Sequence, residues 1–256
     1  MRQVNASEIK NFVELNIGSF HEKRLLSLQK LKLGKVLLRK NPYLFKAKNV
    51  SLAQNLVEIL LDAHLSSQEE TIFGEFLEGL SIFVCGKVYG GNKSSAEGID
   101  LEFEKEAVRY IVAIKSGPNW GNSSQIERMK DNFRKAKRIL RTNSGKKNVV
   151  AVNGCCYGKC NKTDKGEYLK YCGQQYWEFV TGDKNFYLQI IEPLGHKAKE
   201  KNEQFVKSYP KVVNQFTKEF IDKFCHNDGA IDWEKLVKFN SSMSDKMKKD
   251  SKNAKP

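Results

Sequence analysis

The chain has 256 residues, 40% of them hydrophobic and 11% aromatic, which is enough for a sizeable core and excludes wholesale disorder. Lys and Arg number 44 against 30 Asp and Glu, and the resulting charge of +14 favours a polyanionic partner, nucleic acid before an acidic membrane. The sequence shows no apolar run of roughly 18 residues for a membrane span, no signal peptide, and too few cysteines for a disulfide scaffold. We therefore expect a cytoplasmic protein with reduced thiols and no membrane partner.

The first third of the chain predicts helices. Apolar residues recur at helical spacing over 5–38, and Asn41-Pro42 should end this stretch because a residue before proline avoids the helical region. A second amphipathic helix is predicted over 51–65, with Ser51 as its N-cap, and a third over 69–84.

The pattern changes to strands near residue 99. Apolar and acidic residues alternate over 99–104, which predicts a strand with one buried face. Lys105-Glu106-Ala107 should turn the chain into a second strand over 108–114. Glu102 is then expected to be solvated or to pair with Arg109 across the hairpin, although its strand face also allows it to approach a metal.

The remaining elements alternate between helix and strand. Helical spacing predicts a helix over 124–141, and an apolar run predicts a buried strand over 148–153. Further along, the pattern predicts a short aromatic helix over 176–180, a strand over 186–191, and helices over 203–225 and 232–239.

This order of elements predicts an α/β fold with a central mixed sheet and helices on both sides. We expect one domain over 1–240, whose helical N-terminal part, 1–84, is a candidate for dimerisation. Residues 241–256 are rich in Lys and Ser and should form a flexible basic tail.

A carboxylate and a lysine lie where the two hairpin strands can bring them together. Asp100 stands near the start of the first strand, and Lys115 ends the second. A carboxylate can bind Mg²⁺, and an ammonium beside it can orient water and stabilise charge on a phosphate. A single Asp beside a turn is often structural. A lysine at the end of the apolar run 110–114 carries a free-energy cost of burying its charge, unless that charge has a function. The pair therefore indicates phosphodiester hydrolysis.

Asp100 followed by Lys115 resembles the PD-(D/E)xK nuclease motif, in which an acid normally stands two residues before the lysine. This chain has Ala113 at that position. Several branches of the superfamily carry the missing acid on the helix after the lysine strand, which makes Glu127 the candidate. The resemblance also implies a glutamate from an early helix, for which Glu78 is the best match. Mg²⁺ would then be bound by Asp100, Glu127 and Glu78.

The similarity extends over roughly 40–182 to one group of type II restriction endonucleases, which cut interrupted palindromes of the purine-GGNCC-pyrimidine type. The resemblance implies a restriction-endonuclease-like fold and Mg²⁺-dependent double-strand cleavage by a homodimer, leaving a 3′-hydroxyl and a 5′-phosphate. It also implies a cognate DNA methyltransferase as a functional partner without a stable complex. The segments that carry it are Asn41-Pro42, Ile72-Phe73-Gly74, Gly98-Ile99-Asp100, Lys115-Ser116-Gly117, 149–158 and Tyr176-Trp177.

The residues around Glu127 allow a structural interpretation as well. Ser124 and Glu127 have the spacing of a capping box, in which the glutamate bonds a backbone N–H at the helix start. Gln125 and Asp131 are neighbours that could take its place at a metal. The role of Glu127 is therefore open between metal binding and helix capping.

Two segments are candidates for DNA contact. Residues 128–147 are strongly basic, and although a charge run is usually a solvated face, this one follows the proposed site, where phosphates would lie. The polar, Gly-rich loop 117–124 could bind phosphate through backbone N–H groups or read base edges. The predicted DNA-contacting residues are Asn119, Trp120, Asn122, Ser123, Lys135 and Arg138.

Four cysteines raise the question of a zinc site. Cys155, Cys156, Cys160 and Cys172 do not have the paired CxxC spacing of structural zinc sites, and two adjacent residues of a strand point to opposite sides. Buried thiols are the expected outcome, with zinc as the alternative.

The leading interpretation is a type II restriction endonuclease. A structure-selective or nonspecific nuclease of the same superfamily would share the site but not the sequence specificity. The third interpretation is not an enzyme: a DNA-binding protein that is catalytically inactive because Ala113 replaces the acid.

Overall fold

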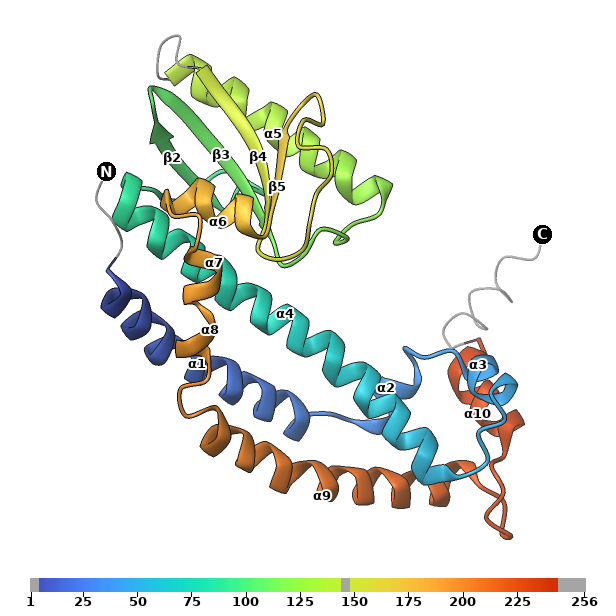
Figure 1. Cartoon of the computed structure of the whole chain (residues 1–256). Helices are drawn as coiled ribbons and strands as arrows, with labels where there is room; N and C mark the ends of the chain where they lie inside the picture. The colour runs from blue at the N-terminus through green and yellow to red at the C-terminus, as the bar shows by residue number, and fades with distance from the viewer. Residues whose placement is uncertain (1–4, 144–147, 244–256) are drawn as a thin grey trace, which may run out of the picture. The chain divides into compact units, whose positions relative to one another are not determined.

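The computed structural model describes residues 5–143 and 148–243, which divide into two compact units. The first unit comprises the N-terminal residues up to His21 together with Glu70–Lys199, and the second comprises Glu22–Glu69 together with the chain from Glu200 onward. The first unit holds the sheet and the second is helical (Figure 1). The predicted tail lies outside the described residues from 244 onward.

A five-stranded mixed sheet organises the first unit, with the strands in the order β1-β2-β3-β4-β5. The strands β1 (Asn92–Lys93), β2 (Leu101–Lys105) and β3 (Val108–Lys115) pair antiparallel. The strands β4 (Asn148–Cys155) and β5 (Leu169–Cys172) run parallel to β3. The carboxyl ends of β3, β4 and β5 therefore meet at one edge of the sheet.

Helices cover both faces of this sheet (Figure 1). The amphipathic helix α5 (Ser123–Asn143) packs its apolar side on one face. The other face packs against the first-unit portions of α1 (Ala6–Gln29) and α4 (Ala53–Tyr89) and against α6 (Gln174–Thr181). The predicted α/β fold, with a mixed sheet flanked by helices and a helical N-terminal region, is confirmed.

The hairpin between β2 and β3 forms as predicted, on a tight turn. Its two turn residues, Glu106 and Ala107, both have positive φ values, of 53° and 60°. Two left-handed residues in succession give the turn a twist that matches the right-handed twist of the flanking strands. The register Lys105↔Val108 to Leu101↔Val112 follows from this turn.

The helix boundaries in the first third of the chain differ from the prediction. The helix expected over 5–38 ends at Gln29, and the short helix α2 (Leu33–Leu37) follows. Asn41-Pro42 begins a helix, α3 (Pro42–Ala47), because the Asn41 Oδ1 atom accepts a hydrogen bond from the Tyr43 N–H at 3.0 Å. Asparagine at the N-cap and proline at the first position are a standard helix start.

The two helices expected over 51–65 and 69–84 are one continuous helix, α4. The intervening residues, Ser66-Ser67-Gln68, contain no glycine or proline that would break it. Because α4 begins at Ala53, the prediction that Ser51 caps it is wrong.

The predicted strand over 186–191 is also wrong. This segment forms the short helices α7 (Phe186–Gln189) and α8 (Ile191–Leu194). Just before it, the Asn185 N–H donates to the Asp183 carboxylate at 2.8 Å, which turns the chain into the first of these helices. A short apolar run does not distinguish helix from strand by periodicity. On the side away from β3, the strand that pairs with β4 is β5, which the prediction missed.

The second unit is built on α9 (Ala198–Phe224) and α10 (Trp233–Ser241), which confirm the two predicted C-terminal helices. Apolar residues of these helices pack with α2, α3 and the second-unit part of α4 around a core of their own. Within the described part of the chain, no helix combines the length and the apolar character needed to cross a membrane.

Candidate active site

The hairpin brings Asp100 and Lys115 together at the carboxyl end of β3. Leu101 pairs with Val112, so the backbone of Asp100 comes opposite the end of the lysine strand. The Asp100 Oδ2 atom accepts a hydrogen bond from the Ile114 N–H at 2.7 Å and lies 3.9 Å from Lys115 Nζ. The two side chains are 22% and 31% exposed, so both charges can reach solvent or a ligand.

Asp100 has a perturbed acidity. Burial raises the pKa of its carboxyl above the ordinary value, whereas the Ile114 N–H and the Lys115 ammonium act to lower the pKa. The negative charge of Glu78 raises the Asp100 pKa further. A bound cation would relieve both the desolvation of the Asp100 carboxylate and its repulsion with Glu78.

Glu78 reaches this site from α4. Its carboxylate acts electrostatically on Asp100 and also lies 3.4 Å from Lys93 Nζ of β1. The Glu78 side chain is 28% exposed. The predicted early-helix glutamate thus lies close enough to Asp100 for its charge to act on the aspartate.

Glu127 lies elsewhere. Its Oε1 atom is 2.6 Å from Lys130 Nζ, and its Oε2 atom is 3.8 Å from the Arg134 guanidinium, along α5. Glu127 is not among the charges that act on Asp100. The neighbour Asp131 is likewise paired, at 2.6 Å from Arg134. The structure therefore does not bring Glu127 or Asp131 to the aspartate.

The capping box at the start of α5 is formed by other residues than predicted. The Gln125 N–H donates to Asn122 Oδ1 at 3.0 Å, and the Asn122 N–H donates to Gln125 Oε1 at 3.0 Å. The pairing of Ser124 with Glu127 as a capping box is therefore wrong, because the helix begins at Ser123 and Asn122 is its N-cap.

The donor atoms at the site suit a hard cation. Asp100 and Glu78 supply carboxylate oxygens, and the described residues contain no cluster of three or more His, Cys, Asp or Glu side chains suited to a metal. Mg²⁺ is ordinarily bound by one or two carboxylates, with water and substrate phosphate completing its coordination. The pair of carboxylates fits that pattern.

The four cysteines lie near the ends of β4 and β5. Cys155, Cys156 and Cys172 are buried, and Cys160 is half-buried. The Cys172 thiol interacts with both Cys155 and Cys160, and burial raises the pKa of the Cys155 thiol to about 12. Among the described residues, no group of three or more His, Cys, Asp or Glu side chains is arranged to hold a metal ion.

Trp120, one of the predicted DNA contacts, lies against Lys115. Its indole N–H donates to Asn153 Oδ1 at 3.1 Å, and Lys115 Nζ lies 5.3 Å from the centroid of its ring. Asn153, only 1% exposed, donates in turn from Nδ2 to the Ala113 carbonyl at 3.1 Å. Asn153 was not among the predicted site residues. The signal that could have found it is a polar amide at the end of the apolar run of β4.

The other predicted DNA contacts lie on the surface of the first unit. Asn119, Asn122, Ser123, Lys135 and Arg138 are all exposed, and Asn122 also caps α5. The basic run is partly neutralised by acids outside it, since Glu167 and Glu97 pair with Arg134 and Arg128. Lys146 and Lys147, at the end of this run, lie outside the described residues.

A family model described as type II restriction endonuclease EcoO109I matches residues 7–202, which is more than half of the chain. The chain belongs to this family. The matched span includes the whole sheet, both residues of the Asp100–Lys115 pair and Glu78. Membership of the EcoO109I family confirms the restriction-endonuclease part of the predicted resemblance. No curated protein matches the sequence significantly.

Proposed function

We propose that this member of the EcoO109I family is an Mg²⁺-dependent endonuclease of the PD-(D/E)xK superfamily, which cuts both strands of DNA at a specific sequence. The observation that carries the proposal is the Asp100–Lys115 pair, 3.9 Å apart at the carboxyl end of β3. The charge of +14 supports a polyanionic substrate.

Asp100 and Glu78 are the residues that would hold Mg²⁺. When bound, the ion would lower the pKa of water and polarise a phosphoryl oxygen. The charge of Glu78 acts on Asp100 and that of Glu127 does not, which supports Glu78 as the carboxylate that compensates for Ala113.

Lys115 has the role of charge stabilisation. Its ammonium, held between the Asp100 carboxylate and the Trp120 ring, can donate hydrogen bonds to a phosphate oxygen as negative charge builds up there during attack by water. In-line displacement would leave a 3′-hydroxyl and a 5′-phosphate. The Ile114 N–H fixes the Asp100 carboxylate, so the orientation of both charged groups is set before substrate binds.

The substrate and the partners follow from the family. Family membership supports recognition of an interrupted palindrome of the purine-GGNCC-pyrimidine type. A palindromic site has two-fold symmetry, which a homodimer would match, with the N-terminal helical part over 1–84 as the candidate interface. A cognate methyltransferase would protect the host sequence without forming a stable complex.

Digestion of one sequenced plasmid in the presence of Mg²⁺ tests the proposal. The wild-type chain should give discrete fragments, and Asp100→Asn and Lys115→Met should each lower the cleavage rate by several orders of magnitude while remaining folded. Asp131→Asn and Lys223→Met are matched controls, because they change an exposed acid and an exposed lysine that lie in other ion pairs.

Each other outcome contradicts a named part of the proposal. A smear of fragments would indicate a nonspecific nuclease. Retarded DNA that stays uncut in both Mg²⁺ and Mn²⁺ would indicate a binding protein inactivated by Ala113. Cleavage by either site variant at a near wild-type rate would show that the site is misassigned.

A further inference from the structure

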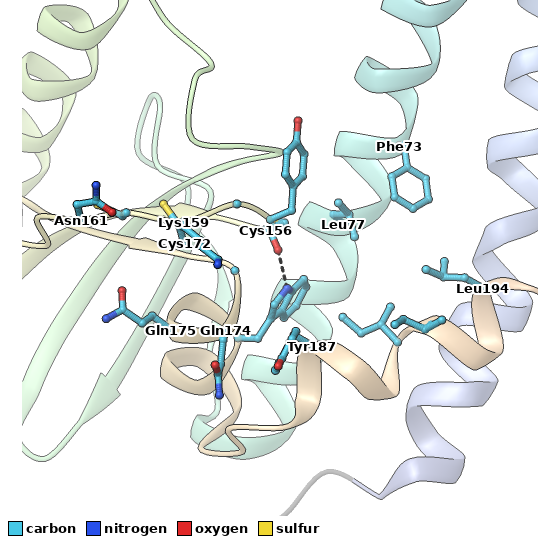
Figure 2. A pocket seen from close by; sticks show the side chains of 17 residues that line it. Phe73, Leu77, Cys156, Lys159, Asn161, Cys172, Gln174, Gln175, Tyr187 and Leu194 are labelled. Carbon is cyan, nitrogen blue, oxygen red and sulfur yellow. Dashed lines mark hydrogen bonds between the residues drawn. The ribbon is translucent and has the colours of Figure 1, made fainter.

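A groove with a volume of about 840 Å³ opens beside the carboxyl ends of β4 and β5, within the first unit. Polar and apolar side chains line opposite sides of it (Figure 2). The polar side carries Lys159, Asn161, Gln174 and Gln175, and the apolar side carries Phe73, Leu77 and Leu194. Neither the motif nor the predicted DNA contacts account for these residues.

The chain segment after β4, which lines one side of the groove, is hydrogen-bonded to the end of the strand that carries Lys115. The N–H of Cys156 donates to the Lys115 carbonyl at 2.9 Å, and the N–H of Tyr157 donates to the Ser116 carbonyl at 3.0 Å. The chain after β4 therefore continues the parallel pairing past the end of β3. Anything that binds this wall is positioned relative to the catalytic lysine by main-chain hydrogen bonds.

Glycines let the loops at this edge pack without intervening side chains. A Cβ atom at Gly117 would collide with the Tyr157 ring, and one at Gly158 would lie 2.6 Å from Pro118. One at Gly173 would lie 2.6 Å from the Gly158 carbonyl oxygen. Gly158 and Gly173 also have positive φ values, of 88° and 53°, which glycine adopts without strain. The loops after β3, β4 and β5 are thus a closely packed platform.

The polar side of the groove presents hydrogen-bonding groups that the protein leaves unused. Asn161 and Gln175 are exposed, and their amides make no hydrogen bond to any residue that the structure describes. Gln174 donates from Nε2 to the Lys184 carbonyl at 3.1 Å, which leaves its Oε1 atom as an acceptor. Lys159 is exposed, and over the described residues no carboxylate lines the groove.

These features match the edge of a DNA duplex. Asparagine and glutamine amides bond bidentately to adenine, lysine bonds to the O6 and N7 atoms of guanine, and apolar side chains contact the thymine methyl group. The absence of lining acids suits a polyanion, and the wall is hydrogen-bonded to the strand that ends at the proposed cleavage site. By contrast, the Asn122 Oδ1 atom and the Trp120 indole N–H, in the loop predicted to contact DNA, already form hydrogen bonds within the protein.

We propose that this groove is the base-reading surface of the protein, with Asn161 and Gln175 as specificity-determining residues. The inference rests on the proposed function, because base readout serves a sequence-specific nuclease. It places recognition on the chain after β4 and at the start of α6, beside the loop 117–124 that the sequence suggested.

The test selects duplexes from a library with a randomised central segment, in Ca²⁺, using the full chain with Asp100→Asn to prevent cutting. Asn161→Ala and Gln175→Ala are added singly and together. Asn214→Ala with Gln215→Ala is the matched control, since these are exposed amides on α9. Thermal unfolding of each variant verifies that it is folded.

The full chain with Asp100→Asn alone, the parent, should enrich one sequence motif. The groove variants should lose the preference at particular base pairs of that motif. Loss of one bidentate contact should weaken binding to the enriched sequence about tenfold or more, with nonspecific binding and its salt dependence unchanged. The control should enrich the parent's motif. As a second pair, Asn161→Asp and Gln175→Glu remove the amide donors and retain the shape of the side chains. Because a carboxylate accepts from cytosine N4, these two variants should change which base is preferred at the affected positions.

Two results overturn the inference alone. One is an unchanged motif at unchanged affinity in both sets of variants. The other is equal weakening on every duplex with a flatter salt dependence, which would make these residues phosphate contacts. If instead the Asp100→Asn chain enriches no motif, the result contradicts the proposed function itself and, with it, the inference.

Discussion

The charges around Asp100 predict that two neighbouring substitutions shift its acidity in opposite directions. The Lys115 ammonium favours the ionised carboxylate, and the Glu78 charge disfavours it. Lys115→Met should therefore raise the pKa of Asp100 in the metal-free protein, and Glu78→Gln should lower the Asp100 pKa. The two effects share one reporter group, so a change of fold cannot produce both.

The size of the lysine effect follows from the separation of the charges, 3.9 Å between Lys115 Nζ and Asp100 Oδ2. Two unit charges at this distance attract by about 1 kcal/mol in water and by about 4 kcal/mol at an effective dielectric constant of about 20. Each side chain is less than one third exposed, so the pair belongs between these limits. Glu78 is 28% exposed and itself paired with Lys93, so its removal should have the smaller effect.

The assay is a carboxyl-carbon NMR titration without divalent cations, with the Asp100 signal assigned by its loss in Asp100→Asn. Lys135→Met, an exposed lysine on α5, is the control and should leave the titration unchanged. In the wild-type chain, the proposed function predicts that cleavage falls in acid, because a protonated Asp100 would not bind Mg²⁺. If both substitutions moved the Asp100 pKa in the same direction, the electrostatic account of the site would be wrong.

Four further predictions concern the effect of Asp100 on stability, the role of Trp120 beside Lys115, the phosphate contacts of α5, and Glu127, which lies away from Asp100. Because folding raises the Asp100 pKa, ionisation there destabilises the fold as pH rises through that range, so Asp100→Asn should raise the melting temperature at neutral pH and not in acid. Trp120→Phe loses the indole donor and retains a ring, so it should lower kcat with little change in KM, and Trp120→Ala should lower kcat further. Replacing both Lys135 and Arg138 by Ala should flatten the dependence of log K on log salt by about 0.9 per lost phosphate contact, whereas an unchanged slope would place them away from DNA. Glu127→Gln should leave Mg²⁺-dependent cleavage within about twofold of wild type in steady-state assays, since the substitution removes only exposed ion pairs, which are worth little.

The sequence predicted those parts of the fold whose signal is periodic over several residues. The hairpin was accessible because alternation and a turn coincide there, and α5 because its apolar residues recur over many helical turns. The proximity of Asp100 and Lys115 followed from the hairpin alone. Asparagine and proline at 41–42 were misjudged because the same residues mark both the end of one helix and the start of the next.

The remaining details depend on tertiary contacts that have no local pattern. The four residues of β5 are a strand because β4 offers an edge, and the Leu169-Lys170-Tyr171-Cys172 segment shows no alternation. Glu78 could be tied to Asp100 only through the resemblance, because the two residues lie on different elements. Asn153 was missed because a single buried amide acquires its partners, Trp120 and Ala113, from other elements.

The packing of the loops after β3, β4 and β5 would keep the proposed cutting residues and the proposed base-reading residues structurally separate. Glycines and main-chain hydrogen bonds hold the platform together, and of the side chains at 159, 161, 174 and 175 only Gln174 forms a hydrogen bond to a described residue, the Lys184 carbonyl. Those four positions can therefore be exchanged without displacing Lys115. A library that randomises them on an otherwise constant chain would explore new target sequences at a fixed cutting geometry, which makes the fold a starting point for programming specificity.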